Sequence, residues 1–309
     1  MNSIAVMGAG AVGGFYGALL AQAGRPVSFI ARGAHLAAIR ERGLIMRGKN
    51  GDVPVRSIKA TNDPAGVGPV DVILQCVKFY DLAATSRQML PMIGPNTLVV
   101  PVQNGVTAHE EIGAIVGNER VVGGLVFLSS FAIAPGVVEL KSPVDQLIFG
   151  EIDGTLSDRV RTFRDAGVAA GYTATASGKI LADLWSKFVM LTGTSAVSCL
   201  SRQPVGKVCE DDGLRGLMEQ GIREAVAVAA AKGIALPPEI VESSVAFNRS
   251  VKYSTRISML EDLEAGKPLE LDWASGYLVR EGRRLGVPVP FHEMAYACLK
   301  PFAAGTVRR

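Results

Sequence analysis

Residues 3–14 read Ser-Ile-Ala-Val-Met-Gly-Ala-Gly-Ala-Val-Gly-Gly, and this stretch decides the fold. The apolar run at 4–7 predicts a short buried strand, and residues 11–23 predict a helix directly after it. Between them, Gly8-Ala9-Gly10-Ala11-Val12-Gly13 has the G-x-G-x-x-G spacing of a dinucleotide-binding turn. Gly8 permits the tight turn, Gly10 lets the backbone approach a pyrophosphate, and Gly13 lets the helix pack on the strand. The alternative is a glycine-rich turn in another kind of α/β protein.

The next apolar run, residues 27–31, completes a strand–helix–strand unit of about 30 residues. Enzymes that use NAD place an acidic residue about 20 positions beyond the glycines, where it binds the ribose hydroxyls. Arg32 stands 19 residues after Gly13, with no acid nearby. An arginine can pair with a 2′-phosphate through its planar guanidinium, so the sequence favours NADP. The alternative is an exposed arginine in a loop.

Two polar residues follow buried strands in the first half of the chain. The strand predicted at 71–78 ends in Lys78, and the strand at 97–102 leads into Gln103-Asn104-Gly105. Ligands of open α/β sheets bind outside the carboxyl ends of the strands, so Lys78 and Asn104 are site candidates. Helices are predicted beside these strands at 34–42, 80–92 and 107–116, and a hairpin at 44–55.

After residue 120 the pattern changes to strands in succession, at 121–130, 136–141 and 146–152. Ala134-Pro135-Gly136 is a turn signal between two of them, which predicts an antiparallel addition to the sheet. A helix at 157–170 and a strand at 172–176 close the first domain. From residue 177 only helices are predicted, at 180–200, 214–232, 237–248, 255–265, 269–285 and 290–302. The fold class is therefore an α/β dinucleotide-binding domain, residues 1–176, followed by an all-α domain, residues 177–309, with a cleft expected between them.

Composition excludes several classes of protein. A net charge of +3 without a dense basic run argues against nucleic-acid binding. The four cysteines form no C-x-x-C pair, and the three histidines, read as ordinary helix or loop residues, have no metal-ligand spacing, so no metal site is expected. The chain shows neither a signal-peptide core nor an apolar run of about 20 residues, which predicts a cytoplasmic protein without a membrane span.

Two ionisable residues of the helical half are candidates for proton chemistry. Lys187 lies within Leu184-Trp185-Ser186-Lys187-Phe188-Val189-Met190-Leu191, where desolvation would lower its pKa toward a value useful for proton transfer. Alternatively, its stem covers apolar surface while the ammonium reaches water. Glu270 opens a predicted helix, where the helix dipole alone favours a carboxylate. Neither residue is assigned from these observations alone.

The chain as a whole resembles the ketopantoate reductase family, through motifs spread over nearly its full length. They are, in order, the glycine turn, the strand ending in Lys78, Gln103-Asn104-Gly105, Trp185-Ser186-Lys187, Arg202-Gln203-Pro204-Val205-Gly206, Ser258-Met259-Leu260-Glu261-Asp262, and Glu270-Leu271-Asp272 with Gly276. The resemblance implies a Rossmann-type NADPH-binding domain, a helical second domain, and reduction of a 2-keto acid to a 2-hydroxy acid.

Residue roles follow from the resemblance, position by position. Lys187 matches the family's general acid, and Glu270 matches the acidic residue that contacts the cofactor or the substrate hydroxyl. Asn104 matches the asparagine near nicotinamide and substrate, and Ser258 matches the hydroxyl that binds the substrate carboxylate. Arg32 and Lys78 match basic residues at the phosphate end of NADP. The resemblance thus implies that residues 8–13 and these side chains bind a small 2-keto acid and its cofactor.

The chain departs from the family at two positions. The family often has asparagines four and eight residues after the catalytic lysine, where this chain has Leu191 and Ser195. Leucine cannot hydrogen-bond a substrate, although Thr192, Thr194 or Ser195 could supply a hydroxyl. Ketopantoate is therefore the expected substrate, with another 2-keto acid and a catalytically silent NADP-binding sensor as alternatives. Helical second domains of this type also allow a homodimer.

Overall fold

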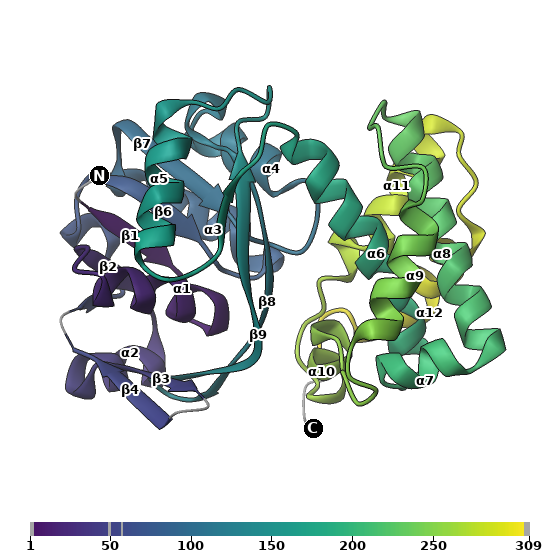
Figure 1. Ribbon diagram of the computed structural model, residues 1–309, viewed down its shortest axis with the longest axis horizontal. Coiled ribbons are helices and arrows are strands. Elements are labelled where there is room, and N and C mark those ends of the chain that lie inside the picture. The colour runs from purple at the N-terminus through teal and green to yellow at the C-terminus, as the bar shows by residue number, and fades with distance from the viewer. Residues whose placement is uncertain (1–2, 49–50, 57, 306–309) are drawn as a thin grey trace. The chain divides into compact units, whose positions relative to one another are not determined.

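The computed structural model describes residues 3–48, 51–56 and 58–305. The chain divides into two compact units, Met1–Ile180 and Leu181–Arg309 (Figure 1). Each unit is described separately below.

Unit 1 is built on a five-stranded parallel sheet, of which the sequence predicts every strand except the short edge strand at Lys59–Thr61. Its strands are ordered β5-β2-β1-β6-β7, and every neighbouring pair is parallel. Helix α1 (Ala11–Gln22) connects β1 to β2, and α3 (Phe79–Gln88) follows β6. The chain order reverses beside β1, which has β2 on one side and β6 on the other. The strands are β1 (Ile4–Met7), β2 (Val27–Ile30), β5 (Lys59–Thr61), β6 (Val70–Gln75) and β7 (Ile93–Pro101).

A second sheet corrects one prediction. The strands expected at 136–141 and 146–152 are one long strand, β9 (Val137–Gly150), which pairs antiparallel with β8 (Gly123–Ala134). The register shifts between Leu128 and Ser130, and the pairing continues on both sides of the stretch that looks like a break in the sequence. This pair does not extend the parallel sheet. It joins β3 (Leu44–Gly48), β4 (Gly51–Val55) and β10 (Ala174–Ala176), with β3 and β4 paired antiparallel as the hairpin prediction requires.

Helix α1 lies between the two sheets. A side chain at Gly14 would meet Val138 of β9 at 2.7 Å, and one at Gly17 would meet the ring of Phe29 of β2 at 2.5 Å. The hydroxyl of Tyr16 donates a hydrogen bond to the carbonyl of Asp145 at 3.1 Å. Glycines on two faces of α1 therefore allow both sheets to approach its backbone closely.

The other helices of unit 1 are α2 (Gly33–Arg42), α4 (Ala108–Val116) and α5 (Asp158–Ala169). The helix predicted at 80–92 is shorter than expected. Helix α3 ends at Gln88, and a 3₁₀ turn, Leu90–Met92, follows it. Pro91 explains the break, because proline has no N–H for the helical ladder and its ring clashes with the preceding turn. Two further 3₁₀ turns span Pro64–Gly66 and Asn118–Arg120.

Unit 2 is helical, as predicted, with different boundaries. The helix expected at 255–265 begins only at Ser258, and the one expected at 269–285 is split at Ala274, with φ −105° and ψ −107°. A short helix at 205–210 was not predicted. The α-helices are α6 (Ile180–Ser201), α7 (Val205–Glu210), α8 (Asp212–Ala231), α9 (Ile240–Ser250), α10 (Ser258–Glu264), α11 (Ser275–Leu285) and α12 (Pro290–Leu299), and the 3₁₀ turns are η4 (Leu271–Trp273) and η5 (Lys300–Phe302).

Glycines set the closest helix contacts in unit 2. A side chain at Gly193 of α6 would lie 2.6 Å from the carbonyl oxygen of Met218 in α8. A side chain at Gly221 of α8 would overlap the ring of Phe291 in α12, 2.7 Å away. Gly221 lowers the helix propensity of α8, but it allows α12 to pack close to it.

Candidate functional site

The glycine turn connects β1 to α1 in the predicted geometry. Gly8 has φ +92°, a conformation that favours glycine, and a side chain there would meet Val77 at 2.9 Å. A side chain at Gly13 would lie 2.2 Å from the carbonyl oxygen of Gly8. Gly10 differs from both, because it is exposed and no atom lies within 4 Å of the position its side chain would take. The turn is therefore closed on the strand side and open at Gly10.

Helix α1 presents its N-terminus at this opening. Gly10 is the N-cap residue, and no side chain caps the first turn. The first N–H groups of a helix lack partners within the helix and lie at the positive end of its dipole. The turn can therefore accept a phosphate through backbone groups alone.

His35 holds this turn in place, a role that the sequence analysis missed. Its Nδ1 accepts a hydrogen bond from the backbone N–H of Gly136 at 3.1 Å. Because that N–H can only donate, the proton of the neutral ring is on Nε2, which donates to the carbonyl of Ala9 at 2.7 Å. One imidazole thus connects the glycine turn to the β8–β9 turn. No sequence spacing signals this role, since the contact with Gly136 spans 101 residues.

Arg32 lies beside the glycine turn and is bonded to Asp81. It is the N-cap residue of α2, its side chain is 86% exposed, and it donates a hydrogen bond to Asp81 Oδ2 at 2.9 Å. Arg32 follows β2, and Asp81 lies in α3, which follows β6. Since β2 and β6 flank β1, this ion pair bridges the two elements on either side of the turn. Exposed ion pairs contribute about 0–1 kcal/mol, so a phosphate can compete for the guanidinium.

Lys78 and Asn104 lie at the same edge of the sheet. Strand β6 ends at Gln75 rather than at Lys78, and Lys78 is the partly buried N-cap residue of α3. Asn104 is exposed and follows β7, which ends at Pro101. Because β6 lies parallel beside β1 and β7 lies parallel beside β6, the structure brings these two residues to the edge that holds the glycine turn.

The buried residue before Asn104 connects the two loops. The side-chain amide of Gln103 donates to the carbonyls of Gln75 and Val77, each at 2.9 Å. It therefore holds the loop that leads from β6 to Lys78 against the loop that carries Asn104. The sequence analysis named Gln103 only as part of a motif.

Lys187 of unit 2 lies on α6 and is only 8% exposed. The rings of Trp185 and Phe188, on the same helix, pack edge to face with centroids 5.5 Å apart. Burial lowers the pKa of Lys187 from 10.5 to about 8, and the nearby carboxylate of Glu270 opposes part of that decrease. The structure thus places the carboxylate of Glu270 where it interacts electrostatically with Lys187. The pKa of the ammonium lies about one unit above neutral pH.

The surroundings of Glu270 and Ser258 differ from those expected. Glu270 is not in the first turn of an α-helix, because it precedes the 3₁₀ turn η4. Ser258 is exposed and is the first residue of α10. Leu269 and Leu271, on either side of Glu270, belong to the same buried cluster as Met259 and Leu260 of α10. Apolar packing therefore joins the segments that carry the two polar residues.

The α6 face around Lys187 determines which hydroxyl is available. Thr192 donates to the carbonyl of Phe188, and Thr194 donates to that of Met190 at 3.2 Å. Both are buried and bonded to their own helix, whereas Leu191 and Ser195 are partly exposed. They stand four and eight residues after Lys187, so all three side chains share one face of α6. Ser195 is therefore the hydroxyl best placed to compensate for Leu191.

His292 is fully buried rather than an ordinary helix residue. Its Nε2 donates to the carbonyl of Gly221 at 2.9 Å, and its Nδ1 accepts from the hydroxyl of Ser275 at 3.1 Å. Glu224 accepts the backbone N–H groups of Phe291 and His292 at the start of α12. Burial lowers the pKa of His292, which favours the neutral ring that these bonds require. This cluster fixes α11 and α12 against α8.

Metal binding and membrane spanning can be judged over the residues that the structure describes, 3–48, 51–56 and 58–305. No group of three or more histidine, cysteine or acidic side chains there could hold a metal ion. None of the helices in that part of the chain is long and apolar enough to cross a membrane.

Comparison with known families and proteins bears on the whole chain. The family model for ketopantoate reductase PanE/ApbA matches residues 4–154, and the model for the C-terminal domain of the same family matches residues 179–303. An uncharacterized oxidoreductase, YkpB, of Bacillus subtilis is 29% identical over 97% of this chain and 98% of its own length. A 2-dehydropantoate 2-reductase of Mesorhizobium japonicum is 30% identical over 97% of each chain.

A solved structure agrees with this result. The PanE/ApbA family ketopantoate reductase from Ralstonia eutropha superposes with a TM-score of 0.90 at 29% identity, over 97% of this chain and 98% of its own. The two family models together match most of the sequence, in the order of the two units. The chain therefore belongs to the ketopantoate reductase family and is an oxidoreductase.

Proposed function

We propose that this protein reduces 2-dehydropantoate (ketopantoate) to pantoate with NADPH. The observation that carries the proposal is the environment of Lys187, a buried lysine whose pKa is lowered to about 8 beside the carboxylate of Glu270. A general acid is most effective when its pKa lies near the working pH. Membership of the ketopantoate reductase family supports the same reaction.

The proposed chemistry divides between cofactor and protein. NADPH, when bound, supplies the hydride that adds to the keto carbon. Lys187 Nζ holds a proton and gives it to the carbonyl oxygen as that oxygen becomes an alkoxide. Its positive charge also polarises the carbonyl before transfer. Glu270 favours the protonated form of Lys187, and we assign it a second role in orienting the substrate hydroxyl or the cofactor.

The cofactor is held by residues at the carboxyl edge of the parallel sheet. The residues of the glycine turn, 8–13, bind the pyrophosphate through the N-terminus of α1. Arg32 and Lys78 bind the 2′-phosphate end, and Arg32 exchanges its exposed bond with Asp81 for the phosphate. Asn104 contacts nicotinamide and substrate. This arrangement favours NADPH over NADH because the guanidinium of Arg32 pairs with the 2′-phosphate, which NADH lacks.

Substrate selection depends on the Lys187 face of α6. Ser258 is proposed to bind the carboxylate of the keto acid, and Ser195 its remaining polar group. Leu191 favours a second candidate substrate for the same reaction. This substrate is a 2-keto acid that carries an apolar group where ketopantoate has a hydroxyl. An apolar contact discriminates between such substrates weakly, whereas an unpaired polar group does so strongly.

Steady-state oxidation of NADPH, followed with ketopantoate and with branched apolar 2-keto acids, tests the proposal. Ketopantoate is expected to give the highest kcat/KM, and Lys187→Ala to reduce kcat by about 100-fold or more. Leu191→Asn distinguishes the two candidates, with Ser195→Ala as the matched change on the same face. If the wild-type protein prefers apolar 2-keto acids and the Leu191→Asn variant prefers ketopantoate, the second candidate is established. Tight NADPH binding without turnover of any 2-keto acid would refute both.

A further inference from the structure

The first turn of α2 carries two residues that bond in different directions. Arg32 is the N-cap residue, and His35 follows about one helical turn later with a partly buried side chain. The exposed guanidinium of Arg32 bonds to Asp81. The imidazole of His35 instead donates to the carbonyl of Ala9 at 2.7 Å. One turn of helix therefore connects the residue proposed to bind the 2′-phosphate with the glycine turn proposed to bind the pyrophosphate.

The parallel sheet alone does not fix the distance between these two sites. The glycine turn is held to the end of β2, because Gly8 and Ala9 donate their N–H groups to the carbonyl of Ile30 at 3.1 and 3.3 Å. The next residue, Ala31, donates instead to the carbonyl of Thr61 at 2.9 Å, in β5 on the other side of β2. The chain thus leaves the glycine turn after β2, and the imidazole bond connects α2 back to it.

The turn between β8 and β9 fixes the orientation of the imidazole. Gly136 donates its N–H to Nδ1 of His35 at 3.1 Å, so the ring proton is on Nε2 and is donated to the glycine turn. The carbonyl of Gly136 accepts the N–H of Ile45 at 2.8 Å. Arg42 of α2 donates to the carbonyl of Pro135 at 2.7 Å. Because the β8–β9 turn is held in this way, it presents a fixed donor to the ring.

We propose that His35 is a positioning residue for recognition of the 2′-phosphate, an inference that rests on the proposed assignment of Arg32 and the glycine turn to NADPH. The bond to Ala9 sets the distance between the guanidinium and the N-terminus of α1. NADPH has to place two anionic groups, one at each end of that distance, whereas NADH places only its pyrophosphate. A displaced α2 therefore weakens binding of the phosphorylated cofactor selectively, since the spacing of its two anionic groups is set by covalent bonds.

Two amide substitutions separate the two bonds of the imidazole. A glutamine carries its NH₂ group near the place of Nε2, so His35→Gln retains a donor for Ala9. An asparagine is shorter and carries its oxygen near the place of Nδ1. His35→Asn therefore retains an acceptor for Gly136 and loses the donor for Ala9. Because the bond to Ala9 positions Arg32, only the glutamine variant should retain selectivity for the 2′-phosphate.

Isothermal titration calorimetry of the full chain tests the proposal without relying on turnover. NADP⁺ carries both anionic groups, NAD⁺ only the pyrophosphate, and 2′-AMP only the 2′-phosphate. His35→Ala should raise the dissociation constant for NADP⁺ at least ~10-fold, and those for NAD⁺ and 2′-AMP no more than about threefold. His35→Gln should recover most of the selectivity, measured as the ratio of the NAD⁺ to the NADP⁺ dissociation constant. His35→Asn should resemble His35→Ala.

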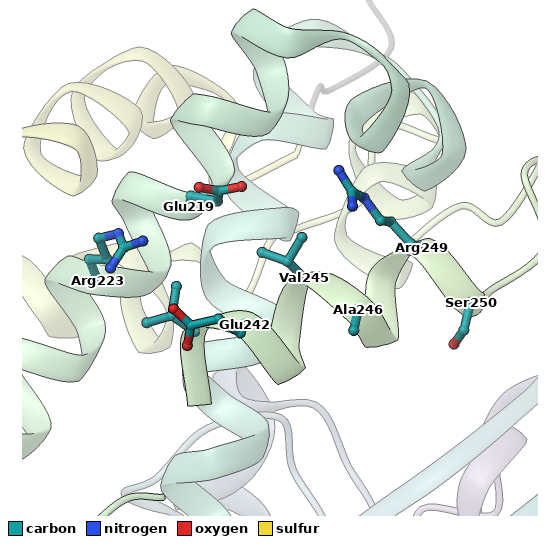
Figure 2. Close-up of a pocket in the computed structure, with 8 residues that line it drawn as sticks. Glu219, Arg223, Glu242, Val245, Ala246, Arg249 and Ser250 are labelled. Atoms are coloured by element: carbon teal, nitrogen blue, oxygen red, sulfur yellow. The ribbon is translucent and has the colours of Figure 1, made fainter. Parts of the chain in front are cut away.

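A change in the β8–β9 turn provides a second test with a matched control. Arg42→Ala removes the bond to Pro135 and should lower the selectivity about twofold to threefold. Arg249→Ala also removes an exposed arginine, in this case from the hollow that α8 and α9 line in unit 2 (Figure 2). This control should leave the selectivity unchanged. Circular dichroism of every variant separates an effect on binding from a loss of fold.

Equal weakening of NADP⁺ and NAD⁺ by His35→Ala overturns the proposal, because it would show that the ring supports the glycine turn and does not position Arg32. Full selectivity in His35→Asn also overturns it. Arg32→Ala identifies a failure of the assignment beneath the proposal, since unchanged selectivity in that variant would exclude a contact of Arg32 with the 2′-phosphate. If Arg32→Ala abolishes the selectivity and His35→Ala preserves it, the assignment of Arg32 stands and only the role of His35 is refuted.

Discussion

Protonation of Lys187 should govern the pH dependence of reduction. With a pKa of about 8, the ratio of charged to neutral lysine is about 10:1 at pH 7 and about 1:10 at pH 9. The value of kcat/KM should therefore fall about tenfold between these pH values, because only the charged form can donate the proton. A lysine with the ordinary pKa of 10.5 would stay more than about 95% protonated over the same range and would give an almost flat profile.

The assay measures NADPH-dependent reduction at saturating cofactor from about pH 6.5 to pH 10. The descending limb should have its midpoint near the pKa of Lys187. Glu270→Gln removes the carboxylate that opposes the pKa decrease, so the midpoint should move to lower pH. A profile that stays flat beyond about pH 9.5, or a midpoint that Glu270→Gln moves upward, would refute the assignment of Lys187 as the buried proton donor.

Three further predictions concern stability and cofactor binding. Lys187→Met should raise the free energy of unfolding by up to about 3 kcal/mol near pH 7, because the decrease in pKa from 10.5 to about 8 measures how strongly the fold disfavours the ammonium. That cost to the wild-type fold is fully present below about pH 8 and disappears toward pH 10.5. In urea titrations the stability gained by Lys187→Met should therefore shrink as pH rises. Equal stability of the variant and wild type at pH 7 would contradict the reasoning. Asp81→Asn should lower the KM for NADPH by about twofold to fivefold, because it releases Arg32. Arg32→Ala should raise the KM for NADPH about tenfold and leave the KM for NADH unchanged. An equal effect of Arg32→Ala on both cofactors would argue against a 2′-phosphate contact. Gly10→Ala should weaken NADPH binding and leave the melting temperature within about 2 °C of the wild-type value. Gly13→Ala should lower the melting temperature, because its Cβ would lie 2.2 Å from the carbonyl oxygen of Gly8. Similar thermal shifts for both variants would show that this contact relaxes easily.

Local signals were sufficient to predict four strands of the parallel sheet, but not β5, which is only three residues long. Glycine spacing, short apolar runs and helical periodicity identified β1, α1 and β2 to within about one residue. The same signals could not assign β8 and β9, because a polar interruption within β9 looks like a turn until the bulged pairing with β8 is known. Sheet membership is likewise a long-range property, so the pairing of β3 with β9 had no local signature.

The candidate site divides in a similar way. The residues of the glycine turn, Arg32, Lys78 and Asn104 could be placed because parallel strands bring their carboxyl ends to one edge. Apolar neighbours along α6 indicated the burial of Lys187, but its partner Glu270 came from resemblance rather than from spacing. The roles of His35 and Gln103 could not be predicted, because their hydrogen bonds join segments 26 or more residues apart. Hydrogen bonds of that kind follow from tertiary packing, and no periodicity encodes them.

The enclosure of α1 between two sheets has a consequence for how the cofactor is received. A helix covered on one side can shift or fray when an anion binds at its end. Helix α1 is held by β2 on one face and by β9 on the other, and its first turn is tied through Ala9 and His35 to Gly136. Its amide dipoles are therefore oriented before any phosphate arrives, and binding needs almost no ordering of the backbone. Gly10 thus leaves room for the phosphates, while Gly14 and Gly17 let the two sheets hold the helix whose dipole attracts them.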